Sequence, residues 1–240
     1  MTVDVEALAN EIDATLAAAG TPERAEQERA YLKSSLTHYG TTVPGIRKVV
    51  KAVVAQHRDL THDELVALVA ALWEVPVYER RAGAVELLEQ LGDRLGPADA
   101  PMLERLLRES RTWALVDNLS ASVVGPLVER SPEWGAVLDR WAVDDDFWIR
   151  RSALLALLLA LRAGGGDFDR FGRYADAMLD EREFFIRKAI GWVLRDTGRR
   201  RPDLVYAWLL PRAARASGVT IREAVKPLSE EQRAAILAAR

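Results

Sequence analysis

Trp148-Ile-Arg-Arg-Ser152 is one copy of a pentapeptide that returns along the chain at intervals of about 35 residues. Related copies begin at Tyr78, Trp113, Phe185 and Thr220, so that the five first positions are 35, 35, 37 and 35 residues apart. A weaker copy, Gly45-Ile-Arg-Lys-Val49, begins 33 residues before Tyr78. A repeat of this length is typical of helix pairs stacked into an α-solenoid. The sequence therefore predicts an all-α fold built from HEAT-like helical repeats.

The segments between these copies also have the pattern of amphipathic helices. Predicted helices include residues 22–36, 112–129, 146–162, 184–197 and 202–209. Thr21 and Ser131 each precede a proline, which is a signature of a helix start. No segment shows the alternation of a convincing strand. We therefore expect a single repeat domain over residues 1–240, with the extended concave face of a solenoid.

The composition is that of an ordinary globular protein, with 49% hydrophobic and 29% charged residues. The absence of cysteine excludes disulfides and thiolate chemistry. The three histidines, His38, His57 and His62, are accompanied in sequence by no H-E-x-x-H motif or carboxylate cluster, so we expect no metal and no cofactor. The acidic, amphipathic N-terminal segment does not resemble a signal peptide, and no apolar run is long enough for a membrane helix. The expected location is cytoplasmic.

Charge is distributed unevenly along the chain. The formal net charge is -3, yet residues 147–240 contain 18 Lys and Arg against 11 Asp and Glu, a balance of +7, which leaves -10 for residues 1–146. One part of the surface is therefore expected to attract phosphate while another stays acidic. The alternative is uneven surface charge without a function.

Cations recur at one position of the pentapeptide. Counting the first residue as 0, positions 0, +3, +4 and +7 fall on one face of a helix. Position +3 is a cation in four of six copies: Lys48, Arg81, Arg151 and Lys188. Stacked helices lie about 8–10 Å apart, so a stripe of cations at that pitch could follow a phosphate backbone. Solvated surface residues are the simpler interpretation of each one.

One copy breaks the pattern at position +4. The residue there is small in most copies, but the copy that begins at Trp113 has Asp117 in its place and loses its cation to Val116. Trp113 and Asp117 share a helix face as i and i+4, and Trp192 holds position +7 of a later copy. A repeat broken at one residue is typical of a functional residue.

Two indoles, a carboxylate and an arginine suit one kind of chemistry. A purine alkylated at N3 or N7 is cationic, and indole faces attract cations by about 0.5–2 kcal/mol. Such a base leaves readily, so a carboxylate such as Asp117 need only stabilise the positive charge that develops on the sugar or orient the attacking water. Arg151 would hold a nearby phosphate. Each residue also has a structural interpretation: Trp113 and Trp192 as core, Asp117 as a helix cap or an arginine partner, and Arg151 as a structural residue.

The chain resembles the DNA alkylation repair glycosylases of the AlkD type over most of its length. The resemblance rests on Ala30-Tyr31-Leu32-Lys33, Leu72-Trp73-Glu74-Val75-Pro76, Trp113-Ala-Leu-Val-Asp117, Trp148-Ile-Arg-Arg151 and Arg222-Glu-Ala-Val-Lys226. Its most specific part is the stretch Glu183–Arg195.

The resemblance implies an enzyme that excises N3- and N7-alkylpurines, such as 3-methyladenine and 7-methylguanine, from double-stranded DNA. By position it makes Asp117 the catalytic carboxylate, Trp113, Trp192 and Tyr31 the lesion contacts, and Arg151 a backbone contact. We expect a monomeric, monofunctional glycosylase that associates with the nucleoid when bound to DNA. Two alternatives remain: a non-catalytic HEAT-like scaffold, and a DNA-damage-binding module without catalysis.

Overall fold

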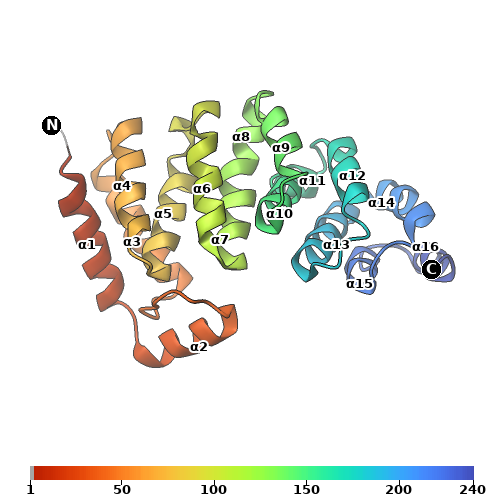
Figure 1. The fold of residues 1–240 in the computed structure, drawn as a ribbon, viewed down its shortest axis with the longest axis horizontal. Coiled ribbons are helices and arrows are strands. Elements are labelled where there is room, and N and C mark those ends of the chain that lie inside the picture. Colours follow the sequence, from red (N-terminus) through yellow and green to blue (C-terminus); the bar gives the residue numbers. More distant parts are fainter. Residues whose placement is uncertain (1–2) are drawn as a thin grey trace. The chain divides into compact units, whose positions relative to one another are not determined.

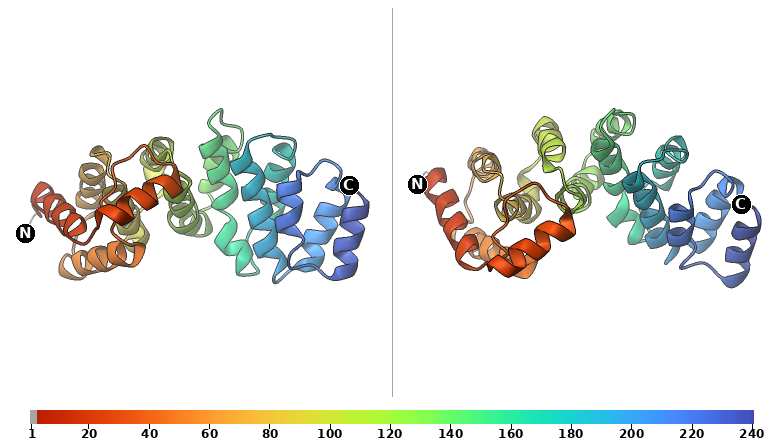
Figure 2. Two further views of the ribbon diagram at one scale, coloured as in Figure 1. Left: turned by 90° about the horizontal axis from the view of Figure 1, so that it is seen from below. Right: turned by 60° about the horizontal axis from the view of Figure 1, so that its bottom comes forward.

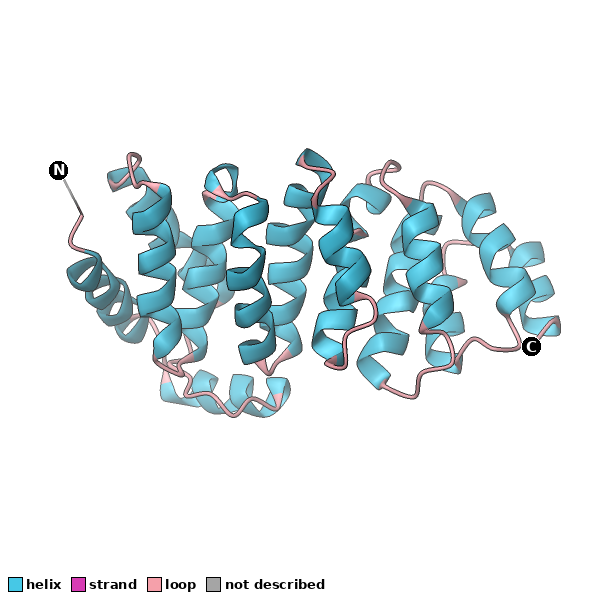
Figure 3. Ribbon diagram, turned by 45° about the horizontal axis from the view of Figure 1, so that its top comes forward, coloured by secondary structure: helices cyan, strands magenta, loops and turns pink. Residues whose placement is uncertain are grey.

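The computed structural model describes residues 3–240, which fold into helices joined by short loops (Figures 1 and 3). Within this range the one pairing of strand type is an isolated bridge between Thr37 and Val77, so the all-α prediction is confirmed. The chain divides into two compact units, Met1–Leu119 and Ser120–Arg240. Between residues 3 and 240, no helix has the length and apolar character that crossing a membrane requires.

The first unit contains seven α-helices within its described part. They are α1 (Val5–Ala18), α2 (Pro22–Leu32), α3 (Val43–Gln56), α4 (His62–Glu74), α5 (Tyr78–Gln90), α6 (Ala100–Ser110) and α7 (Trp113–Asn118). Helices α1, α3, α4 and α5 pack against one another and bury Leu16, Val50 and Leu72 between them (Figure 1). Because leucine and valine side chains return on one face of each helix, their burial supplies most of the stabilising free energy.

Helix α2 is anchored differently from its neighbours. It lies outside the stack of α1, α3, α4 and α5, and Leu32 is its only buried residue (Figure 2). It begins as the sequence predicted, with the Thr21 hydroxyl accepting the Arg24 N–H and Pro22 in the first turn. It ends at Leu32 and is capped by Lys33, whose φ of 49° is left-handed. With so little buried area, α2 depends on local contacts to hold its position.

The second unit begins within a π-helical segment, Leu119–Val124, that continues α7. Its helices are α8 (Gly125–Arg130), α9 (Trp134–Trp141), α10 (Phe147–Leu155), α11 (Leu158–Arg162), α12 (Phe168–Ala177), α13 (Phe184–Gly198), α14 (Pro202–Leu209), α15 (Gly218–Ala224) and α16 (Glu230–Ala238). Helix α13 packs closely on α15, where a Cβ on Gly191 would lie 3.0 Å from the Thr220 carbonyl oxygen. Trp134 and Trp141 are fully buried.

Side-chain hydrogen bonds span the repeat interval in both units. Trp73 Nε1 donates to Glu109 (2.9 Å, 36 residues apart), Arg162 Nε to Asp196 (2.8 Å, 34 apart), and Tyr174 Oη to Asp139 (2.5 Å, 35 apart). A residue and its equivalent one repeat later therefore lie beside each other. The period found in the sequence is the period of the packing, which confirms the helical-repeat fold.

The predicted helix boundaries differ from the structure in several places, and the helix predicted over 22–36 ends at Leu32. The helix predicted over 146–162 is divided into α10 and α11, and the helix predicted over 112–129 contains the π-helical segment. After Ser131-Pro132 the chain forms a turn, so α9 begins only at Trp134. Uniformly helix-favouring residues hide such local changes, because propensity does not distinguish α from π hydrogen bonding.

Candidate active site

Trp113 and Asp117 lie one turn apart on α7 in the first unit, and both side chains are half-buried. Residues at i and i+4 occupy the same helix face, as the sequence predicted. The π-helical segment follows directly after Asn118. Such segments are rare and occur frequently at functional sites. The indole of Trp113 and the carboxylate of Asp117 therefore lie on one helix face, directly before a π-helical segment.

Tyr31, at the end of α2, meets Trp113. Its ring lies edge-on to the indole, with centroids 5.8 Å apart and an interplanar angle of 81°. The tyrosine is 73% exposed, although an aromatic ring gains from burial. Two of the three predicted lesion contacts are thus brought together within the first unit, on residues 82 apart in sequence (113 minus 31).

The two predicted phosphate contacts of the first unit have different surroundings. Lys48 on α3 is exposed. Arg81 on α5 is buried: it donates to the carbonyls of Trp73 (3.3 Å) and Glu109 (2.8 Å), with its guanidinium 4.9 Å from the Trp73 ring centre. Burial lowers the pKa of Arg81 from its ordinary value. Arg81 holds neighbouring helices together, a role that the repeat pattern alone did not reveal, and its contact with DNA stays a prediction.

Arg151 on α10 is also internal, with 2% of the residue exposed. Its Nη1 donates to the carbonyl of Phe185, and its guanidinium lies 5.8 Å from the centre of the Phe185 ring. Phe185 is the first residue of the following copy, so this arginine links two repeats. The structural interpretation of Arg151 thus has direct support, and its contact with a DNA phosphate stays a prediction.

Lys188 on α13 is half-exposed and pairs with Glu223 of α15 at 2.8 Å. Glu223 also accepts from Lys226 (2.9 Å) and from Arg195. These cations, Lys188 first, outweigh the opposite effect of burial and lower the pKa of Glu223 to about 2. Glu223 stands at position +3 of the last copy, one repeat after Lys188. The spacing of 35 residues could have identified this ion pair in the sequence.

Trp192 lies two turns beyond Phe185 on α13 and is half-buried. Its indole N–H donates to Oδ2 of Asp196 at 3.1 Å. Asp196 is buried and also accepts from Arg162 (2.8 Å) and Arg195 (3.1 Å). Burial by itself would raise the pKa of Asp196, but the two arginines reverse the effect and lower it. Sequence reasoning missed Asp196, although its position four residues after Trp192 was a usable signal.

Carboxylates lie beside two of the three histidines in the fold, although no motif in the sequence marks them. His38 lies beside Glu28 and Glu79, and His62 lies beside Asp63 and Asp99 at 2.9 Å each. The partners of His38 come from helices 10 residues before it and 41 after it (38 minus 28, and 79 minus 38), separations that no sequence motif marks.

Comparison with known proteins agrees with the repeat architecture. A solved structure described as a predicted DNA alkylation repair enzyme from Enterococcus faecalis is similar, with a TM-score of 0.80 and 23% identity over 88% of this chain and 97% of that one. AlkD2 from Streptococcus mutans is similar with a TM-score of 0.63 and 15% identity over 85% of this chain and 99% of that one. At these identities the likeness shows the fold. A search of curated proteins finds no match.

A family model extends the comparison to the sequence. The model described as "DNA alkylation repair enzyme" matches residues 12–228, which include Tyr31, Trp113, Asp117, Arg151 and Trp192. This match covers most of the chain, and it agrees with the helical repeats and with the structurally similar helical-repeat proteins. The chain belongs to the DNA alkylation repair enzyme family.

Proposed function

We propose that this protein is a monofunctional DNA glycosylase that excises cationic N3- and N7-alkylpurines, such as 3-methyladenine and 7-methylguanine, from double-stranded DNA. The observation that carries the proposal is the half-exposed pair of Trp113 and Asp117 on one turn of α7, with Tyr31 against the indole, in a chain of the alkylation repair family. Aromatic rings and a carboxylate are the groups that suit a cationic base and a developing sugar cation.

Asp117 is the proposed catalytic residue. As the N-glycosidic bond breaks, its electron pair leaves with the alkylated base, which becomes neutral, and positive charge develops on the sugar. A fixed carboxylate stabilises that charge and orients the water that adds to C1′ and then loses a proton. The lesion is already a good leaving group, so no strong general acid is required at the base.

Trp113, Trp192 and Tyr31 are the proposed lesion contacts. Trp113 and Trp192 are half-exposed, so each keeps part of its ring available to a base. Stacking of a base on an aromatic ring contributes about 1–3 kcal/mol, and the positive charge of the lesion adds a cation–π component. These contacts favour alkylated purines over neutral ones.

The DNA backbone is proposed to lie against Lys48 in the first unit and Lys188 in the second, with Arg151 and Arg81 as further phosphate contacts. Lys48 is exposed, and Lys188 keeps 39% of its side chain exposed while paired to Glu223. An arginine guanidinium has five N–H donors in a planar fork that matches a phosphate, which is the reason for including Arg151 and Arg81. The protein is proposed to act as a cytoplasmic monomer at the nucleoid.

Base release from a duplex that contains a single 7-methylguanine tests the proposal. We expect release by the wild type and a loss of about 100-fold or more with Asp117→Asn, which keeps the size of the side chain and removes its charge. Asp59→Asn, on an exposed residue of the same unit, is the matched control and should leave the rate unchanged.

Two outcomes would contradict this assignment. Equal release by the wild type and Asp117→Asn would remove Asp117 from the mechanism. Tight binding of the damaged duplex by the wild type without any release would leave a damage-binding module in place of an enzyme.

A further inference from the structure

His38 is a buried imidazole without a hydrogen-bond partner. Its side chain is 1% exposed, and neither Nδ1 nor Nε2 forms a hydrogen bond within residues 3–240. The ring is held in place by stacking on Tyr78, at a centroid distance of 4.8 Å and an angle of 11°. Buried polar atoms are nearly always satisfied, so a rigid imidazole that lacks a partner points to a group that it binds.

Two carboxylates surround this ring. Oε2 of Glu28, on α2, lies 4.0 Å from His38 Nδ1 and is itself buried without a hydrogen bond. Glu79, on α5, accepts the N–H groups of Tyr39, Gly40 and Thr41, which uses two lone pairs of Oε1 and one of Oε2. Since each carboxylate oxygen has two lone pairs, Glu79 keeps one for a further partner.

These three side chains form the one group within residues 3–240 whose nitrogen and carboxylate oxygens are gathered as metal ligands would be, within 4.8 Å of one another.

We propose that Glu28, His38 and Glu79 form a binding site for a divalent transition-metal ion, with Zn²⁺ as the best fit. One imidazole and two carboxylates are a ligand set that Zn²⁺ accepts, whereas Ca²⁺ and Mg²⁺ prefer oxygen alone. Zn²⁺ bonds of about 2.0–2.2 Å set neighbouring ligands about 3.4 Å apart, so binding draws the groups inward. Glu28 is the ligand that can move, because α2 is the least anchored helix of the unit.

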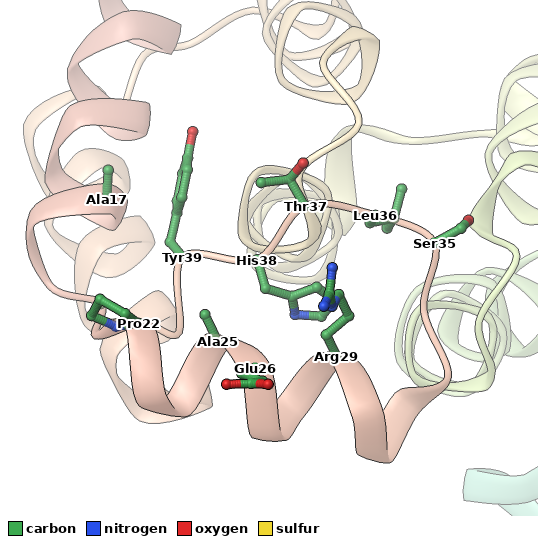
Figure 4. Close-up of a pocket in the computed structure, with 11 residues that line it drawn as sticks. Ala17, Pro22, Ala25, Glu26, Arg29, Ser35, Leu36, Thr37, His38 and Tyr39 are labelled. Atoms are coloured by element: carbon green, nitrogen blue, oxygen red, sulfur yellow. The ribbon is translucent and has the colours of Figure 1, made fainter.

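The site lies beside an open pocket of about 670 Å³, lined by residues of α1, α2 and the loop Ser35–Tyr39 (Figure 4). In Figure 4 the loop carries His38 toward the helix that carries Ala25 and Arg29. Coordination by Glu28 would join α2 to this loop, which is itself tied to α5. The ion would thereby fix α2, the helix that presents Tyr31 three residues after Glu28.

Calorimetric titration of Zn²⁺ into the full-length protein, after EDTA treatment and desalting, tests the site. We expect one ion per chain in the wild type and an affinity loss of about 100-fold in both His38→Gln and Glu28→Gln. His62→Gln is the matched control, because it also removes an imidazole that lies beside two carboxylates, and it should bind like the wild type. Circular dichroism verifies that each variant is folded.

Two readouts on the wild type keep the test independent of variants that fail to fold. Co²⁺ should give the visible absorption of a tetrahedral site, and Zn²⁺ should slow amide hydrogen exchange in α2 by about 10-fold. No saturable binding, or binding equal in the wild type and His38→Gln, would overturn the site. Binding without protection of α2 would overturn the link to Tyr31.

Discussion

The two tryptophans predicted to contact the lesion are restrained in different ways. Trp192, in the second unit, donates its indole N–H to the buried Asp196, which two arginines hold in turn. The aromatic neighbour of Trp113, in the first unit, is the exposed Tyr31, on a helix with a single buried residue. One indole is fixed by a network of charges, whereas the other rests against a ring that can shift. A rigid element positions a ligand, and an adaptable one accommodates differences between ligands.

Asp196→Ala should have the largest effect on the difference between the two tryptophans, because it removes the restraint on Trp192. It removes the acceptor of Trp192 and leaves Arg162 and Arg195 without their buried partner, so we expect the free energy of unfolding to fall by about 3 kcal/mol. Chemical denaturation measures this loss. The control is Asp180→Ala, which removes a carboxylate that is 66% exposed and pairs with Arg215, and which should cost under about 1 kcal/mol. Similar losses in the two variants would mean that the network does not restrain Trp192.

Arg151→Ala separates the internal role of this arginine from its proposed role at DNA. Loss of the buried hydrogen bond to Phe185 should lower the free energy of unfolding by about 2 kcal/mol. If Arg151 also contacts a phosphate, the slope of log affinity for duplex DNA against log salt should decrease by about 1. An unchanged slope together with lower stability would leave Arg151 a purely structural link between repeats.

The lowered pKa of Glu223 predicts how the stability of the folded protein changes at acid pH. Its pKa is about 2 in the folded protein and 4.5 ordinarily, so the unfolded chain binds the proton more readily. The stabilisation is complete above pH 4.5 and disappears as the pH falls to about 2, with a magnitude of about 2 kcal/mol. Melting temperatures across this range should fall more steeply in the wild type than in Glu223→Gln. Parallel curves would show that Lys188 and Arg195 contribute little through this carboxylate.

Substitutions of Tyr31 should have the smallest effect, and they test whether the ring that contacts Trp113 contributes to base release. Tyr31→Ala removes an edge-to-face contact of about 1 kcal/mol, so base release should slow about 5-fold. Tyr31→Phe keeps the ring edge and should retain most of the activity. If the phenylalanine variant is as slow as the alanine variant, the hydroxyl rather than the ring is the important group. The global stability of both variants should match that of the wild type, since the side chain is exposed.

Much of the fold could be predicted because the repeat period is a property of the chain itself. The 35-residue spacing, the cap at Thr21 and the shared face of Trp113 and Asp117 all follow from local periodicity. The surroundings of Arg81 and Arg151 could not be predicted in this way. A single-helix projection shows which residues share a face, but not whether that face meets solvent or the carbonyl groups of the next repeat.

The neighbours of His38 were hidden for a different reason. Its carboxylates belong to α2 and α5, and the loop that carries the ring follows no helical period. Such contacts arise only from the tertiary fold. Asp196 could be predicted in part: the sequence shows its position four residues after Trp192, but it does not show that Asp196 is buried.

The Glu79 carboxylate accepts the N–H groups of three consecutive residues, Tyr39 to Thr41. These hydrogen bonds limit how the length of this loop can change during evolution. An inserted or deleted residue between Tyr39 and Thr41 would shift every amide away from the carboxylate. Gly40, at φ 84°, is fixed as well, because a Cβ there would lie 2.2 Å from the Thr21 carbonyl oxygen. Length variation among relatives should therefore gather in surface turns such as Gly164–Gly166, while this loop keeps its number of residues.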